Sequence, residues 1–349
     1  MANLARSMPT DFSRNPAATL RAAGPSQQAL HEAARQARDA EFGNRVFVRG
    51  VIEVSNFCRE NCAYCGMRRD NRALHRYRLA LEPLLAMLLE DRPAAMTDLN
   101  IQTGEDPRAL REIVLPLVQE LRRHTDLGLS VCLGTHSQED CQALHEAGAD
   151  YYVMKIETGD EALYRQVQSP GTLPERLAAI HQLAAGGWHV SSGVIAGLPG
   201  MTEEQLIASL EMLRDLPLAG CSVSPFIPGE QTPMAALPAG DLDLTLNCLA
   251  FMRLQSPWRV IPAVSAMTLT GSDGYARAIR AGANLATINL TPSEERRDYV
   301  LYKRDRQIMT EERILREIDA AGCEPSPMGI SAWLNARRHA AAPLRAAAG

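Results

Sequence analysis

Short Val- and Ile-rich runs alternate with longer helix-patterned segments along most of this 349-residue chain, and this alternation constrains the fold more than any other feature. Polar or Gly-containing turn residues follow most of the runs, which is typical of strands. The predicted strands cover residues 45–55, 98–103, 128–133, 150–157, 189–197, 221–227, 258–264 and 285–290. The predicted helices cover residues 81–92, 107–124, 138–148, 173–187, 202–216, 243–255 and 274–282. We therefore expect an α/β chain that forms a (β/α)8 TIM barrel, with a doubly wound open sheet as the alternative.

The segments that flank this alternation also have helical patterns. Residues 1–45 are rich in Ala and Arg, and we expect an N-terminal helical cap there. The barrel is expected over residues 46–305, followed by a C-terminal helical extension and tail over 306–349. The length is compatible with one large domain that carries such extensions.

Charge and hydropathy argue against several kinds of partner. The formal net charge is -5, whereas nucleic acid or an anionic membrane surface would call for a basic face. No apolar run approaches the ~18 residues of a membrane-spanning helix, and the first residues lack the apolar core of a signal peptide. We therefore expect a cytoplasmic protein, with reduced thiols, that binds neither nucleic acid nor membrane.

Three of the eight cysteines lie within CRENCAYC, namely Cys58, Cys62 and Cys65. In a reducing compartment this grouping favours a metal or redox site over disulfides. Three unrelated buried thiols are one alternative. Structural zinc is another, although zinc usually takes four ligands in paired C-x-x-C units and the sequence has no second pair. Three thiolates suit a 4Fe–4S cluster in which one iron stays open to a small molecule.

CRENCAYC resembles the C-x-x-x-C-x-aromatic-C motif of radical S-adenosylmethionine (SAM) enzymes, and it follows the first predicted strand, as the cluster loop does in that superfamily. The wider stretch IEVSNFCRENCAYCGMRRDNRALHRYRL is similar to the branch that contains the FeFe-hydrogenase maturase HydE, biotin synthase and methylornithine synthase. The similarity to HydE extends from about Val46 to about Tyr302. The resemblance implies that the three cysteines hold a 4Fe–4S cluster and that Tyr64, at the aromatic position, belongs to the cofactor site.

Two segments resemble the parts of these enzymes that hold the amino group and the ribose of SAM. QTGED contains Gly104, which allows a close approach of backbone, and Glu105; the backbone of the matching stretch binds the amino group. KIETG contains Glu157, which the resemblance assigns to the ribose. Lys155 stands where relatives have an Arg, and the exchange loses a two-pronged contact. A plain strand-to-helix turn and a surface salt bridge are the structural alternatives.

Two further positions match SAM-binding elements. Arg176 lies in the first turn of a predicted helix, and relatives use the matching Arg against the SAM carboxylate, a geometry that suits a guanidinium. A helix-surface arginine is the alternative. Gly197 lies in GVIAGLPGMT, and the equivalent strand in the superfamily passes beneath the adenine.

Five residues are expected at the substrate end of the barrel. Val264 and Ser265 stand where HydE has paired threonines. Tyr299 and Tyr302 follow a Thr-Pro pair, as tyrosines do in HydE. His136 closes the third predicted strand and could reach the barrel interior, although a satisfied histidine in a loop is an equal alternative.

The resemblance implies a radical SAM enzyme with a single 4Fe–4S cluster, because Cys323 is the only cysteine in the C-terminal region where some HydE proteins carry a second set. An external one-electron reductant of the flavodoxin or ferredoxin type would drive cleavage of SAM to a 5′-deoxyadenosyl radical. The radical would attack a small molecule enclosed in the barrel, in a HydE-like step of metal-cofactor maturation. Alternatives are a carbon-skeleton mutase like methylornithine synthase, sulfur insertion like biotin synthase or, in another class, an iron–sulfur carrier or electron-transfer protein.

Overall fold

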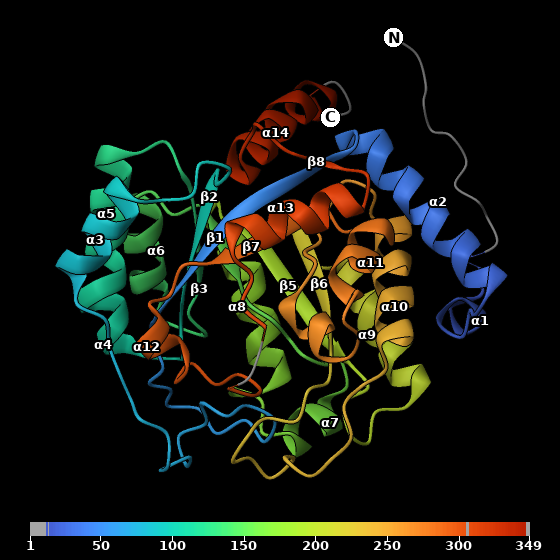
Figure 1. The fold of residues 1–349 in the computed structure, drawn as a ribbon, viewed down its shortest axis with the longest axis horizontal. Coiled ribbons are helices and arrows are strands. Elements are labelled where there is room, and N and C mark those ends of the chain that lie inside the picture. Colours follow the sequence, from blue (N-terminus) through green and yellow to red (C-terminus); the bar gives the residue numbers. More distant parts are fainter. Residues whose placement is uncertain (1–11, 13, 305–306, 347–349) are drawn as a thin grey trace.

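The computed structural model describes residues 12, 14–304 and 307–346, and its centre is a curled parallel sheet (Figure 1). The strands follow the order β6-β5-β4-β3-β2-β1-β7, and a short eighth strand, β8, pairs with β1. Every neighbouring pair is parallel. The strands are β1 (Arg45–Ser55), β2 (Asp98–Thr103), β3 (Gly128–Cys132), β4 (Tyr151–Val153), β5 (His189–Ala196), β6 (Gly220–Pro225), β7 (Leu285–Asn289) and β8 (Glu324–Pro325).

The predicted strand at 258–264 does not form. In its place Val260 bridges Gly220 of β6, and Pro262 bridges Leu285 of β7, each as an isolated contact. Pro262 has no N–H to donate to a neighbouring strand, so a regular ladder cannot be built through it. The parallel α/β class is confirmed, but the expectation of a complete (β/α)8 TIM barrel is wrong: the sheet is a partial barrel.

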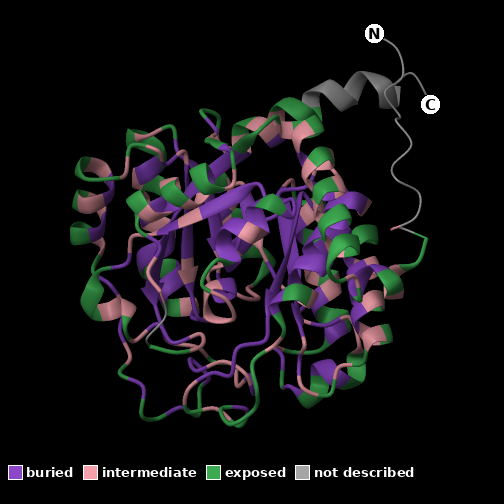
Figure 2. Cartoon of the chain, turned by 45° about the vertical axis from the view of Figure 1, so that its right-hand side comes forward, coloured by how far each residue is buried: buried purple, intermediate pink, exposed green. Residues whose placement is uncertain are grey.

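Helices cover the outer face of the sheet, and the strands are almost wholly buried (Figure 2). The helices that follow β1 along the chain are α3 (Leu81–Glu90), α4 (Pro107–Ala109), α5 (Leu115–His124), α6 (Gln138–Glu146), α7 (Glu161–Gln166), α8 (Leu173–Ala185), α9 (Glu203–Asp215), α10 (Leu242–Gln255), α11 (Gly274–Arg280), α12 (Ser293–Arg296) and α13 (Glu311–Ala320). Two of them begin with capping boxes, α8 at Thr172 and α9 at Thr202. These caps satisfy N–H groups that the first turn leaves free.

The helix predicted over 107–124 is interrupted. A π-helical segment over Leu110–Val114 separates α4 from α5. Pro116 lies two residues after this segment, and a proline inside a helix removes one N–H and clashes with the carbonyl of the preceding turn. The wider π turn accommodates this clash without ending the helix.

The N-terminal segment is helical where it is described, as α1 (Pro16–Leu20) and α2 (Pro25–Phe42). Leu30 and Ala34 of α2 are fully buried in a small core that includes Ala250 of α10. The N-terminal helices therefore pack on the outside of the sheet, beside α10 (Figure 1).

Helix α14 (Ile330–Ala346) lies across the N-terminal ends of the strands (Figure 1). The Ile330 N–H donates to both carboxylate oxygens of Asp98, at 3.1 and 2.9 Å. Ser331 donates to Asp150 at 2.6 Å. Since parallel strands bring like ends together, this helix closes one end of the partial barrel and leaves the other end to the loops.

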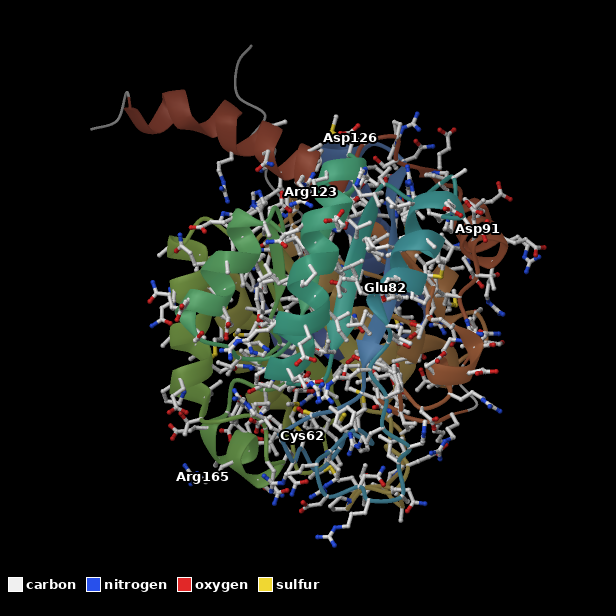
Figure 3. All side chains as sticks on the ribbon, turned by 90° about the vertical axis from the view of Figure 1, so that its left-hand side faces the viewer. Cys62, Glu82, Asp91, Arg123, Asp126 and Arg165 are labelled. Carbon is white, nitrogen blue, oxygen red and sulfur yellow. The ribbon has the colours of Figure 1, made fainter. Side chains whose placement is uncertain are left out.

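The two ends of the sheet differ in their loops (Figure 3). Cys62 lies among long loops at the C-terminal ends of the strands, and Asp126, just before β3, lies at the opposite end. Among the helices of the described segments, none has the length and apolarity needed to cross a membrane.

Candidate active site

The cysteine loop, residues 56–78, has little regular structure, and one arginine holds it together. Arg76 donates to the carbonyls of Asn56 at 2.6 Å, Met67 at 2.9 Å and Arg68 at 2.7 Å. Asn56 in turn accepts the N–H of Tyr77 at 2.8 Å. The loop is therefore fixed by side-chain bonds to its own backbone, which irregular segments need when they are partly buried.

The three thiols lie on this loop at different depths. Cys62 is buried, whereas Cys58 and Cys65 are half-buried. Burial, and then the nearby Cys65, raises the pKa of the Cys62 thiol. Burial, and then the nearby Cys58, raises the pKa of the Cys65 thiol to about 12. Ionising the three thiols together is therefore unfavourable, and a positively charged metal centre would offset that cost.

This donor set fits a cluster better than a single ion. In the described part of the chain, no three Cys, His, Asp or Glu side chains converge as ligands of one metal ion would. In a cubane each thiolate binds a different iron, so the three sulfurs need not share one centre. Three thiols on a well-held loop therefore fit the donor chemistry of a 4Fe–4S cluster.

Gly104, just beyond β2, packs directly against the cysteine loop. A Cβ added there would lie 2.2 Å from the Phe57 carbonyl oxygen and 2.7 Å from the Cys58 Cβ. The next residue, Glu105, donates its backbone N–H to the Cys58 Sγ at 3.3 Å. The glycine thus lets the two loops meet, and the meeting supplies one hydrogen bond to a cluster sulfur.

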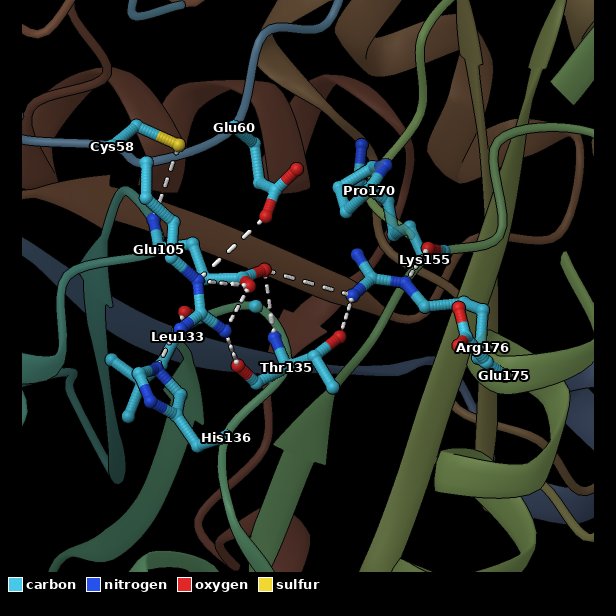
Figure 4. Close-up of polar contacts among 12 residues, drawn as sticks. Cys58, Glu60, Glu105, Leu133, Thr135, His136, Lys155, Pro170, Glu175 and Arg176 are labelled. Carbon is cyan, nitrogen blue, oxygen red and sulfur yellow. Dashed lines mark hydrogen bonds and ion pairs between the residues drawn. The ribbon is translucent and has the colours of Figure 1, made fainter. Parts of the chain in front are cut away.

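Glu105 lies at the centre of a polar network that joins four loops (Figure 4). Its carboxylate accepts Arg59 Nη2 at 2.7 Å and the Thr135 N–H at 2.9 Å. Arg176 approaches the same carboxylate at 4.0 Å and donates to the Thr135 hydroxyl at 2.5 Å. Arg176 also donates to the Lys155 carbonyl at 3.1 Å. Because both Glu105 and Arg176 are buried, the network fixes their orientation.

Glu157 lies on a bulge where β4 was expected to continue. Both Ile156 and Glu157 donate their N–H to the Gly193 carbonyl, and Glu157 has φ 61, a region that non-glycine residues rarely adopt. Its Oε1 pairs with Lys155 Nζ at 3.3 Å, whereas its Oε2 is buried and has no hydrogen-bond partner among the described residues. An orphaned buried carboxylate oxygen is costly, and a ligand hydroxyl would satisfy it. Lys155 and Glu157 therefore lie together, in a geometry that fits a polar ligand.

The wall beside the cysteine loop is apolar. Tyr64 packs on a core that contains Ile195 and Phe226. Gly197, directly after β5, has φ 75, and the Phe226 N–H donates to the carbonyl of Ala196 at 2.9 Å. The chain therefore leaves β5 through a left-handed turn that glycine adopts at little cost.

Comparisons with known proteins agree with this geometry. The model of the radical SAM superfamily matches residues 52–213. The [FeFe] hydrogenase maturase subunit HydE of Thermotoga maritima is 34% identical over 79% of each chain. The chain belongs to the radical SAM superfamily.

Two further relatives support this membership. A 3-methylornithine synthase of Methanosarcina acetivorans is 28% identical over 85% of each chain. The crystal structure of methylornithine synthase (PylB) superposes with a TM-score of 0.81 at 26% identity, covering 90% of this chain and 94% of that one. Radical SAM proteins of this kind are enzymes that use a 4Fe–4S cluster and SAM, and the residues described above fit both groups.

The residues predicted at the substrate end of this radical SAM fold differ from one another in burial and in their contacts. Tyr299 is buried, and burial followed by the nearby Glu53 carboxylate raises its pKa well above the ordinary value. Tyr302 is half-buried, and its carbonyl accepts the Glu230 N–H at 2.8 Å. The two tyrosines belong to a loop that meets the cysteine loop, since the Gly66 N–H donates to the Leu301 carbonyl at 3.4 Å.

Val264, Ser265 and His136 are also partly buried. Val264 and Ser265 begin a single 3-10 turn, Ser265–Leu269. The His136 Nε2 bonds the Leu133 carbonyl of its own loop at 3.0 Å. Its imidazole is therefore held within its own loop, as in the alternative given above, a satisfied loop histidine.

Sequence reasoning did not identify two charged or polar partners of the site. Arg59, inside the cysteine motif, and Thr135, inside CLGTH, complete the network around Glu105. Glu53 was also missed: it is buried in β1 and accepts Asn289 Nδ2 at 3.3 Å. A carboxylate inside a strand of mostly apolar residues was the available signal, because such residues are rarely buried without a reason.

Proposed function

We propose that this radical SAM enzyme generates its radical at the loop end of the partial barrel and delivers it to a small polar molecule on the inner face of the sheet. One observation carries the proposal. The three-thiol loop lies beside the C-terminal end of β2. The bulge that carries Glu157, whose Oε2 is buried and has no partner among the described residues, lies at the same end of the partial barrel. A metal cluster and a hydroxyl-bearing ligand are thus accommodated at the same mouth.

The residues predicted to bind the cluster and SAM each have a proposed role there. Cys58, Cys62 and Cys65 hold the cluster. The backbone around Gly104 and Glu105 receives the amino group of SAM. Because the Glu105 carboxylate is already bonded to Arg59 and Thr135, its proposed part is its backbone and its hold on neighbouring loops.

The remaining SAM contacts fall to four residues. Arg176 binds the carboxylate of SAM while Thr135 and the Lys155 carbonyl hold the guanidinium in place. Glu157 accepts from the ribose, and Lys155 orients the Glu157 carboxylate through their 3.3 Å pair. Gly197, which has no side chain, leaves space for the adenine, and Tyr64 lines that space.

When bound and reduced by one electron, the cluster and SAM together yield methionine and a 5′-deoxyadenosyl radical. We propose that the electron comes from an external flavodoxin- or ferredoxin-type protein and that the enzyme works in the cytoplasm. The protein's own contribution is orientation and exclusion of solvent, because a primary carbon radical reacts with whatever lies near it. Tyr299 and Tyr302, on a loop that contacts the cysteine loop, serve this closure.

The reaction that we favour is a HydE-like step in the maturation of a metal cofactor, on the strength of 34% identity to the Thermotoga maritima protein. A carbon-skeleton rearrangement is the second candidate, favoured by the structural similarity to methylornithine synthase. Val264 and Ser265 stand at the substrate end in place of a threonine pair. The lost hydroxyl favours a substrate that differs from that of HydE.

The proposal is tested by anaerobic reconstitution. Alanine at Cys58, Cys62 or Cys65 should abolish stoichiometric iron binding, whereas Cys248→Ala, which changes a buried thiol on α10, should retain it. The reduced wild-type protein should release 5′-deoxyadenosine from SAM. Retention of iron and sulfide by the triple variant would refute the cluster assignment, and reduced holoprotein that neither binds nor cleaves SAM would favour an iron–sulfur carrier.

A further inference from the structure

A pocket of about 450 Å³ lies beside the cysteine loop, at the loop end of the sheet. The loops that follow β1, β4, β5 and β6 build it. Ala63 is part of its wall, and Ala63 stands in the chain between Cys62, a proposed cluster ligand, and Tyr64. None of the residues to which we assign a SAM contact lines this pocket. The pocket is therefore separate from the proposed cofactor contacts, yet its wall is one residue away from the cluster.

One side of this pocket is apolar and continues onto the molecular surface. Pro233, Met234 and Leu237 line it. Leu237 is 39% exposed, and among the described residues the only other exposed large hydrophobic side chain is Met328, at 46%. Met328 precedes α14, at the opposite end of the sheet. An exposed leucine that extends the wall of an apolar pocket is typical of a surface that a partner covers.

Another side of the pocket carries a buried arginine with an unused donor. Arg68 is 8% exposed; its Nε donates to Asn61 Oδ1 at 2.9 Å and its Nη2 to Gln168 Oε1 at 3.4 Å. Its Nη1 is buried and has no hydrogen-bond partner among the described residues. Asp70, two residues along the chain, accepts from Asn61 Nδ2 at 2.7 Å and pairs with Arg69. A carboxylate brought into the pocket by a partner would satisfy the unused donor of Arg68.

The cysteine loop is basic, whereas the chain as a whole is acidic. Residues 56–78 contain six arginines and two acidic residues, although the formal net charge of the chain is -5. Arg69 and Arg72 of this loop are exposed. On the neighbouring helix α7, Glu161 is paired with Arg165 at 3.4 Å, so this pair adds no net charge. A local basic surface on an acidic protein attracts a partner of opposite charge and orients it as it approaches.

The size of the apolar area separates two kinds of partner. Permanent dimers bury roughly 2,000 Å² or more and are rich in apolar contacts, whereas at this end of the sheet the described residues expose one large hydrophobic side chain, Leu237. Transient electron-transfer complexes bury less than about 1,200 Å². One leucine, a pocket and a basic rim therefore suit a protein that binds briefly, through charge, better than a second copy of this chain.

We infer that a protein electron carrier with an acidic face docks at this pocket. The docking surface comprises the pocket and four residues of its wall and of the basic loop, Arg68, Arg69, Arg72 and Leu237. The inference rests on the proposed function and deepens it, because it gives the external reductant a defined place on the chain. A carboxylate of the carrier bonds Arg68, and an apolar side chain packs against Leu237. One electron passes from the reduced carrier to the bound cluster, the carrier is oxidised by that electron, and no atom is transferred.

Calorimetric titration with a purified acidic flavodoxin tests the docking surface directly. The anaerobically reconstituted protein should bind the flavodoxin, and the affinity should fall as salt is added, because salt screens exposed charges. Leu237→Glu should weaken binding about tenfold or more. The control Met328→Glu places the same charge on the other exposed apolar side chain and should bind like the wild type. Absence of binding by the wild type, or equal losses in the two variants, would overturn the inference.

A second pair of variants tests the charge of the surface. Arg69→Glu and Arg123→Glu change the net charge of the chain equally, and the two arginine side chains are 63% and 66% exposed. Arg123 lies at the end of the sheet opposite to Cys62 (Figure 3). Arg69→Glu should weaken flavodoxin binding about tenfold, and Arg123→Glu should leave it unchanged. Equal losses would mean that net charge governs binding, and a dimer of this chain that Leu237→Glu dissociates would assign the surface to a second copy; either result refutes the docking surface.

Two reductants keep this inference distinguishable from the proposed function. Dithionite is a small anion that needs no docking surface, so it should support the release of 5′-deoxyadenosine from SAM equally in the wild type and all four variants. Reduced flavodoxin should support a slower release in Leu237→Glu and Arg69→Glu than in the wild type. If flavodoxin binds at this surface but neither reductant leads to SAM cleavage, the docking surface stands and the proposed function fails. If dithionite drives cleavage and flavodoxin does not bind, the reverse holds.

Discussion

Replacing Gly104 by Ala should disable the enzyme with little loss of stability. The new Cβ would lie 2.2 Å from the Phe57 carbonyl oxygen, whereas real Cβ contacts essentially never fall below 3.0 Å. The two loops must therefore separate by about 0.8 Å, the difference between these values. The obstructing atoms are backbone and the Cys58 Cβ, so no flexible side-chain end can move aside. The displacement acts directly on the segment that carries a cluster ligand.

The cost to folding should be small because two effects oppose each other. Overpacking typically costs about 1–3 kcal/mol. The Ala residue restricts the unfolded chain and regains about 0.4–1 kcal/mol, since Gly104 does not adopt a left-handed conformation. We expect a net loss of roughly 0.5–2 kcal/mol in the free energy of unfolding. A shift of ~1 Å in a catalytic geometry can cost about 10²-fold in rate, and that is the loss expected for SAM cleavage.

The matched control is Gly186→Ala at the end of α8, where the nearest atom to the new Cβ is the Gln182 carbonyl oxygen at 3.3 Å. Urea unfolding and the initial rate of 5′-deoxyadenosine release should be measured on both variants after reconstitution. Gly186→Ala should match the wild type in rate. If Gly104→Ala keeps the wild-type rate and iron content, the close approach of the two loops has no catalytic importance and the reasoning is wrong.

Two further outcomes follow from the hydrogen bonds of the structure. Glu105→Gln turns an amide donor toward Arg59 or Thr135, which are donors themselves. The substitution should lower the free energy of unfolding, measured by urea titration, by roughly 1–3 kcal/mol, and it should also lower the iron content of the reconstituted protein. Unchanged stability would mean that the network around Glu105 is not structural. His189 is buried between Asn335 and Arg338, and burial lowers its pKa from the ordinary 6.5. The unfolded state then binds a proton at His189 more tightly than the folded state does. The contribution of His189 to the free energy of unfolding is therefore fully present above pH 6.5 and is lost as the pH falls below that value. His189→Gln should flatten this pH dependence in melting experiments, and an unaltered slope would assign it to other histidines.

The alternation of strand and helix could be predicted from the sequence because most of the strands are buried on both faces. Such strands read as short apolar runs, and β1 and β2 begin and end at the predicted residues. The cysteine motif could also be found, because its spacing lies within eight consecutive residues. Local patterns of this kind are determined by neighbouring residues, whose contacts need no long-range information.

Departures from the predicted elements occur where one backbone atom decides the outcome. Pro262 has no N–H, so the segment around it forms only isolated bridges. Pro116 imposes a π turn in the preceding residues. Glu157 lies on a bulge beyond the end of β4, and nothing in the surrounding apolar pattern marks its left-handed backbone.

By itself the sequence determined the α/β class, the three-thiol motif and the segments that meet at the mouth of the sheet. Only the tertiary structure decided which polar groups satisfy one another there. Arg59 and Thr135 converge on Glu105 from two other loops and Arg176 from helix α8, whereas Arg49 has one long hydrogen bond to the described residues. The physical reason is that hydrogen bonding and burial depend on distances between residues far apart in the chain, and the periodicity of a single strand carries no information about those distances.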